Sequence, residues 1–112
     1  MDLIDATKAL LAELQSAEST PESLERAEQA VWGAVAQCDE PALLDQALAL
    51  DALDELPIGL KSAAFERRLA IGPREPAVLR QFADHLWLHG PERDEQVEVL
   101  RREAELLERA QE

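Results

Sequence analysis

The chain has 112 residues, of which 46% are hydrophobic, so it is long enough to bury one core. Its formal net charge of −13 argues against direct binding to nucleic acid, because an acidic surface repels the phosphate backbone. The single cysteine excludes an internal disulfide, and the sequence shows neither a secretory signal nor an apolar run long enough for a membrane span. We therefore expect a soluble, cytoplasmic protein with one domain, residues 1–112, and no membrane partner.

Strong helix formers dominate the composition and β-branched residues are few, which predicts an all-α fold. The first helix is expected from about Asp2 to Ala17, with an apolar stripe at Leu3, Ala6, Leu10, Leu14 and Ala17. Thr20-Pro21-Glu22 announces the second helix, because it offers a capping hydroxyl, a proline for the first helical position and an acid for the first turn. The apolar stripe of this helix is Leu24, Ala27, Val31, Ala34 and Val35.

Asp39-Glu40-Pro41 opens the third helix, whose sequence ALLDQALALDALDEL is apolar around most of its circumference. That pattern predicts a central buried helix that continues to Leu56. Pro57 starts the fourth helix, with an inner face made of Leu60, Ala64, Phe65 and Leu69. Gly72 is expected in the left-handed conformation that closes a helix, and Pro73 prevents the helix from continuing.

Pro76 begins the fifth helix, which carries apolar residues on one side at Val78, Leu79, Phe82, Ala83, Leu86 and Trp87. Gly90-Pro91 ends it and begins the sixth, whose seam is Val97, Leu100, Ala104 and Leu107. A shift of 34 residues aligns Leu44 with Val78, Pro57 with Pro91, and Arg67-Arg68 with Arg101-Arg102. The third and fourth helices and the fifth and sixth helices therefore look like two copies of one hairpin.

The segment from Ala63 to Leu107 resembles the tetratricopeptide repeat, whose helix-turn-helix period is 34 residues. Its matching positions are Phe65, Pro73, Leu79, Phe82, Ala83, Leu86 and Gly90. Arg68 and Asp45 depart from the pattern, since the family usually has alanine and a large residue there. The resemblance implies a short right-handed superhelix of three antiparallel hairpins, namely a divergent first hairpin or cap over 1–38, a second over 41–72 and a third over 75–111.

The resemblance also implies a concave surface that recognises proteins or peptides. The residues of the fifth helix that carry over to this surface are Arg80, Asp84, Trp87 and Leu88. An exposed tryptophan close to an arginine is typical of binding hot spots. In the alternative interpretation, Trp87 fills the interhelical core and Leu88 is an ordinary exposed leucine.

Few residues in the sequence indicate a catalytic or metal-binding site. His85 and His89 stand four residues apart, a spacing that suits zinc, but HLWLH lacks the glutamate of a zinc-protease helix. The simpler interpretation is two surface histidines near a helix C-terminus. We interpret Cys38 as a small packing residue and Asp51 with Glu55 as part of a solvated acidic face, and we predict no metal, cofactor or catalytic site.

The sequence thus favours a non-catalytic module that binds a protein or peptide. Residues 1–55 carry two basic and thirteen acidic side chains, net −11, against nine and eleven, net −2, in residues 56–112. If the acidic half faces the partner, a basic or neutral partner is expected; otherwise the acids only solvate helix faces. The alternative function is a self-associating homodimer subunit without a foreign ligand, joined through the open ends of the hairpin stack.

Overall fold

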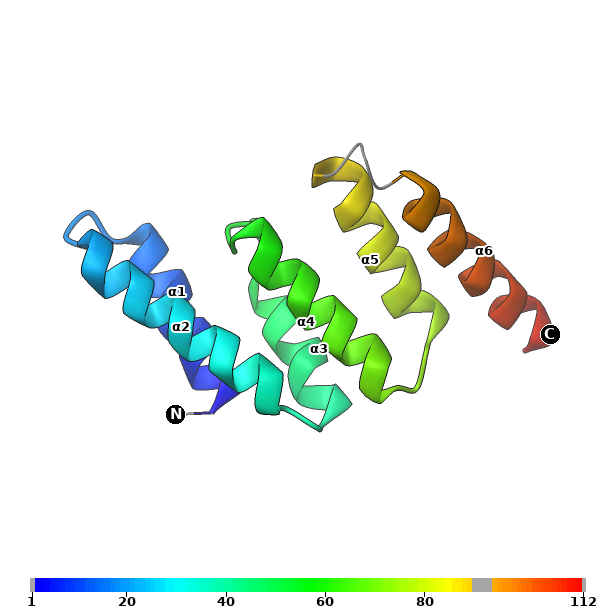
Figure 1. The fold of residues 1–112 in the computed structure, drawn as a ribbon, viewed down its shortest axis with the longest axis horizontal. Coiled ribbons are helices and arrows are strands. Elements are labelled where there is room, and N and C mark those ends of the chain that lie inside the picture. The colour runs from blue at the N-terminus through cyan, green and yellow to red at the C-terminus, as the bar shows by residue number, and fades with distance from the viewer. Residues whose placement is uncertain (1, 90–93, 112) are drawn as a thin grey trace. The chain divides into compact units, whose positions relative to one another are not determined.

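The computed structural model describes residues 2–89 and 94–111, and in these residues the chain is all-α, as predicted (Figure 1). The helices are α1 (Leu3–Gln15), α2 (Pro21–Gln37), α3 (Pro41–Leu50), α4 (Ile58–Ile71), α5 (Pro76–His89) and α6 (Asp94–Ala110). Gly90 and Pro91, the expected turn before the sixth helix, lie outside the described residues. The chain forms two compact units, unit 1 (Met1–Ile71) and unit 2 (Gly72–Glu112). The right-handed superhelix stays a prediction.

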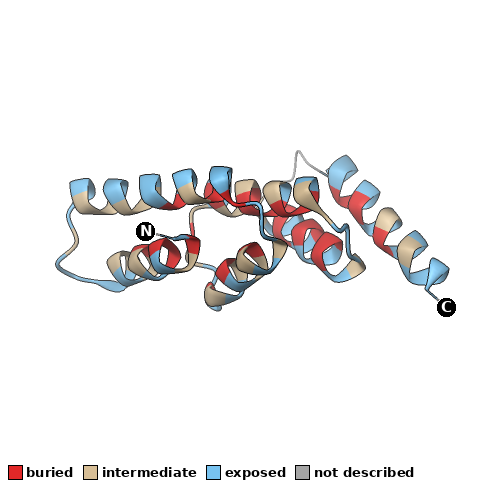
Figure 2. Cartoon of the chain, turned by 90° about the horizontal axis from the view of Figure 1, so that it is seen from below, coloured by how far each residue is buried: buried red, intermediate tan, exposed pale blue. Residues whose placement is uncertain are grey.

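Unit 1 consists of two antiparallel hairpins, α1 with α2 and α3 with α4. Within it α1 also contacts α3, and α2 contacts α4, so that the four helices form two layers (Figure 2). The predicted stripes supply much of this core, which includes Leu3, Ala6, Leu10, Val31, Val35, Leu44 and Leu60. Helical periodicity therefore identified the inward faces of α1, α2 and α4.

Side-chain caps begin α1 and α2, and the cap of α2 is the one that the sequence predicts. The Asp2 side chain accepts a hydrogen bond from the Asp5 backbone N–H at 2.8 Å, directly before α1. Thr20 caps α2 by accepting from the Ser23 N–H at 3.0 Å, and the Ser23 hydroxyl accepts from the Thr20 N–H at 3.0 Å. These bonds satisfy backbone donors that the first turn of a helix leaves without partners.

The prediction of a buried third helix that continues to Leu56 is wrong. α3 ends at Leu50, and its buried residues are Leu44 and Ala47, whereas Leu53 beyond it is 76% exposed. The chain turns because Asp51 is buried and its carboxylate accepts from the backbone N–H groups of Glu55 and Leu56, at 2.6 and 3.2 Å. Asp51 is therefore not part of a solvated acidic face, which corrects the interpretation drawn from its spacing to Glu55.

The two departures from the tetratricopeptide pattern lie together in unit 1. Arg68 of α4 donates from Nε to Oδ1 of Asp45 of α3 at 2.8 Å, and the arginine side chain is only 1% exposed. A buried guanidinium is costly without a carboxylate. One ion pair therefore accounts for both unusual residues.

Unit 2 is the antiparallel hairpin of α5 and α6. Its buried apolar residues are Val78, Leu79, Phe82, Ala83 and Leu86 of α5 and Val97, Leu100 and Ala104 of α6. Gly72, at the start of the unit, has a φ of 67°, which confirms the predicted left-handed residue. Across the two described ranges no helix combines the length and apolar character that a bilayer crossing requires.

Candidate functional site

The four residues predicted to bind a partner share one face of α5. At 3.6 residues per turn, Arg80, Asp84, Trp87 and Leu88 fall within about 100° of the helix circumference. Trp87 is 62% exposed and Leu88 is 64% exposed. The alternative in which Trp87 fills the core is therefore wrong, and so is its assignment to the buried stripe of α5. We call these four residues the α5 face.

The two charged residues of the α5 face form ion pairs with residues of α6. Arg80 forms an ion pair with Glu108, and Asp84 accepts from Nη2 of Arg101 at 3.3 Å. All four side chains are substantially exposed, so these bonds add little to stability. Their effect is to hold charged groups at defined places beside the exposed tryptophan and leucine.

A hollow of about 500 Å³ opens within unit 2, next to the α5 face. Four arginines and two glutamates contribute to its wall, together with the apolar Leu106; the arginines are Arg80, Arg101, Arg102 and Arg109. A guanidinium has five N–H donors, so Arg80 keeps donors beyond those that bind Glu108, and Arg101 keeps donors beyond the one that binds Asp84. The sequence does not indicate this hollow, although the seven-residue spacing of Arg102 and Arg109 places them on one side of a helix.

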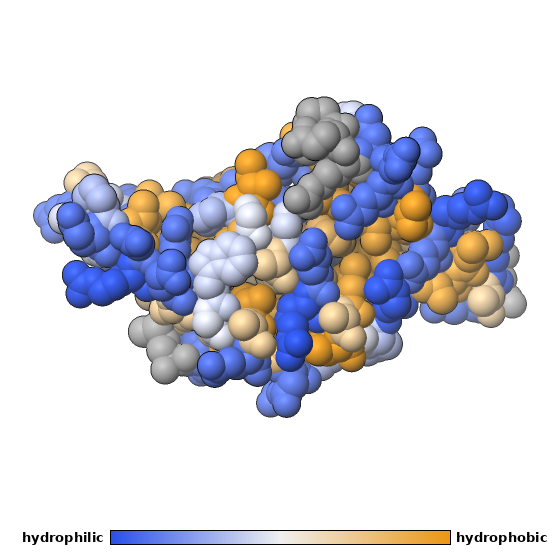
Figure 3. Space-filling view, viewed as in Figure 1, coloured by the Kyte–Doolittle hydropathy of each residue, from blue (hydrophilic) through white to orange (hydrophobic). Residues whose placement is uncertain are grey.

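The surface of unit 2 is mixed in character. In the space-filling view, hydrophobic residues (orange) lie between hydrophilic ones (blue) over α5 and α6 (Figure 3). Val99 and Leu106 of α6 are also exposed, at 63% and 56%. Large apolar groups rimmed by charge are the usual composition of protein-binding surfaces.

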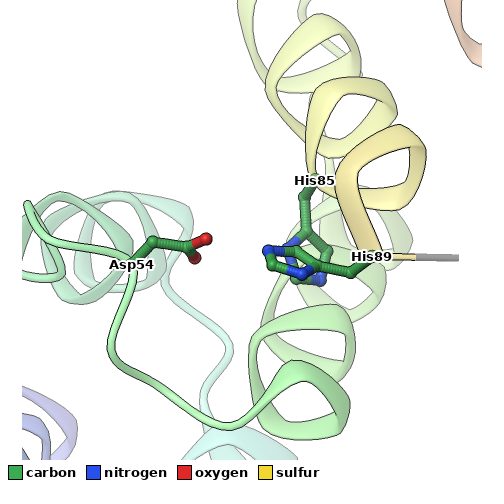
Figure 4. A group of neighbouring side chains, drawn as sticks. All are labelled: Asp54, His85 and His89. Carbon is green, nitrogen blue, oxygen red and sulfur yellow. The ribbon is translucent and has the colours of Figure 1, made fainter.

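His85 and His89 occupy another side of α5. Their rings lie side by side, one helical turn apart, with centroids 5.1 Å apart and planes tilted by 54° (Figure 4). His85 is only 5% exposed and His89 is half-buried. The interpretation of both as surface histidines is therefore wrong for His85.

The nucleophilic side chains of unit 1 have structural roles. Cys38 is buried at the C-terminus of α2, with Sγ 3.5 Å from the Glu40 carbonyl oxygen, as expected of a packing residue. The hydroxyls of Ser19 and Ser23 donate to the Glu13 carboxylate at 2.6 and 2.9 Å, and these bonds lower the pKa of Glu13. They hold the connection between α1 and α2.

Comparisons with protein families, with curated proteins and with solved structures found no match for this chain. The resemblance to the tetratricopeptide repeat therefore stays a prediction.

Proposed function

We propose that this protein is a non-catalytic module that binds another protein or a peptide through the α5 face. The observation that carries the proposal is the exposure of two large apolar side chains in sequence, Trp87 and Leu88, at 62% and 64%. Tryptophan dominates binding hot spots because it offers a large, stiff apolar surface. Covering the exposed part of one tryptophan removes about 120 Å² from water, which stabilises a complex by about 3 kcal/mol.

The surroundings of the α5 face favour a partner of defined chemistry. Trp87 and Leu88 suit a large apolar side chain, and the arginine-lined hollow suits a carboxylate near it. The expectation of a basic partner came from the acidic half of the sequence, residues 1–55, and applies to that surface alone. The proposed ligand of the α5 face is thus a segment that combines an apolar anchor with an acidic residue.

Capture of partners from a lysate of the source organism tests this proposal. The tagged full-length chain is compared with Trp87→Ala and Arg80→Glu, and Leu53→Ala is the control because Leu53 is an exposed apolar residue of unit 1. We expect a partner that the wild type and the control retain, that Trp87→Ala loses and that Arg80→Glu weakens. Equal capture by all four proteins contradicts the assignment of the α5 face.

The second candidate function is homodimerisation, which the exposed side of α6 favours. Val99 and Leu106 are seven residues apart, so they share one side of the helix, away from the buried seam of Val97, Leu100 and Ala104. Light scattering over a concentration range tests it. A dimer that Val99→Glu disrupts supports self-association, whereas a 12.4 kDa species at every concentration contradicts it.

A further inference from the structure

We propose that His85 and His89 form a two-imidazole site for a divalent transition-metal ion such as Zn²⁺. Trp87 of the α5 face plays no part in this site. Trp87 points about 160° away from either histidine around the helix axis, so the tryptophan and the two imidazoles lie on nearly opposite sides of α5. The sequence alone favours no metal site, and the geometry of the two rings is the reason to propose one.

The distance between the ring nitrogens of His85 and His89, which lie one helical turn apart, suits chelation of one metal ion. A ring nitrogen of His85 lies within 4.8 Å of one of His89. Two zinc–nitrogen bonds of about 2.0 to 2.1 Å at a tetrahedral angle place their nitrogens about 3.4 Å apart. The rings therefore need to approach by no more than about 1.4 Å, which small side-chain rotations provide.

The difference in exposure between the two histidines also fits a metal site. His85 is 5% exposed, so its packing limits the orientations that its ring adopts, whereas half-buried His89 leaves a route from solvent. A ligand held in place before binding loses less conformational entropy when the ion arrives. Water or a carboxylate fills the remaining coordination positions, as at zinc sites that keep an open position.

The donor set selects a class of ion. Imidazole nitrogens suit zinc, copper and nickel, whereas carboxylates and water suit magnesium and calcium. The chain carries 24 acidic residues, so hard cations have many carboxylates to bind, but the only two histidines are this pair. Selectivity for Zn²⁺ over Mg²⁺ therefore distinguishes the proposed site from general attraction to an acidic surface.

The test is calorimetric titration of the full-length protein with ZnCl₂, combined with a carbon–proton spectrum of the imidazole groups. We expect one ion per chain and a change in both imidazole Cε1 signals, which are the only two such signals in the protein. His85→Gln and His89→Ala should each lower the affinity at least about 10-fold, since loss of an outer-shell partner alone costs that much. Trp87→Ala and Cys38→Ser are the controls, and both should bind as the wild type does.

Several outcomes overturn the proposal: no binding, equal binding of Mg²⁺, loss of binding in Cys38→Ser, or an affinity that His89→Ala leaves unchanged. Circular dichroism checks the helical content of each variant. If His85→Gln unfolds, His89→Ala decides alone, because His89 is less buried. The controls also separate this proposal from the proposed function, since Trp87→Ala affects partner capture and not the zinc titration.

Discussion

Replacing Asp51 with alanine tests why α3 ends at Leu50. The Asp51 side chain is fully buried and accepts three hydrogen bonds, from the backbone N–H groups of Glu55 and Leu56 and from Nζ of Lys61 at 3.0 Å. Lys61 also pairs with Asp54 at 2.8 Å, so it keeps one carboxylate in the variant. The backbone groups of Glu55 and Leu56 lose the acceptor that they share.

The magnitude follows from these two backbone bonds. A hydrogen bond to a charged group contributes about 1.5 to 3 kcal/mol, so the loss of two at the lower end costs about 3 kcal/mol. Asp51→Asn keeps one carbonyl acceptor and removes the charge, so it should cost about half as much. Glu66→Ala is the control, because Glu66 is an exposed acid of α4 and its loss should change stability by less than about 0.5 kcal/mol.

The assay is urea unfolding followed by tryptophan fluorescence. Each unit contains one tryptophan, Trp32 in unit 1 and Trp87 in unit 2, so a Trp87→Phe background reports on unit 1 alone. We expect the free energy of unfolding to fall in the order of the control, Asp51→Asn and Asp51→Ala. A loss for Asp51→Ala no larger than that of Glu66→Ala refutes the claim that the Asp51 carboxylate fixes this turn.

Three further predictions concern ion pairs. Asp45→Ala should lower the free energy of unfolding by about 2 kcal/mol, because it removes a carboxylate from the buried Arg68. Adding Arg68→Met should recover part of this loss. Additive effects of the two substitutions in a double-mutant cycle contradict an energetic coupling between Asp45 and Arg68. Burial alone lowers the pKa of Lys61, but hydrogen bonds to two aspartates outweigh burial and raise it above 10.5. The Lys61 contribution to stability is therefore present below pH 10.5 and is lost as the pH rises through the folded-state value, and Lys61→Met should remove this alkaline loss in urea titrations. The hydrogen bond from Arg74 lowers the pKa of Glu103 below 4.5, so its contribution is present above pH 4.5 and is lost as the pH falls; an acid titration of Glu103→Gln that matches the wild type contradicts this.

The positions of the helices could largely be predicted because they depend on local signals. Thr20 and Pro21 define the start of α2, Pro76 defines that of α5, and Gly72 follows the end of α4. Each acts through its own backbone geometry or through bonds to residues within one turn. The spacing of apolar residues then identified the buried faces.

The end of α3 could not be predicted, because it depends on a residue outside the helix. The sequence from Ala47 to Leu56 consists mostly of strong helix formers and contains neither glycine nor proline to mark a stop. The turn is fixed by Asp51, which is bound to Lys61 ten residues later. In the same way the pairing of Arg68 with Asp45 joins residues 23 apart, so the sequence showed two unexplained departures and not their connection.

The sequence predicted which residues of α5 form the candidate site, but it did not predict how far Trp87 and His85 are buried. Trp87 lies at the border between the apolar stripe and the polar side of α5, so periodicity assigned it to both. The structure places Trp87 on the solvent-exposed side, because its side chain is 62% exposed. His85 shows the opposite error: it was predicted to be exposed because it is a polar residue near a helix end, but it is buried.

Fluorescence quenching of Trp87 tests the proposed binding surface most directly. In a Trp32→Phe variant, Trp87 is the only tryptophan, and acrylamide should quench it efficiently in the free protein because the ring is exposed to solvent. Adding a captured partner should protect Trp87 from quenching. Poor quenching of Trp87 in the free monomer, or equal quenching with and without the partner, contradicts the account.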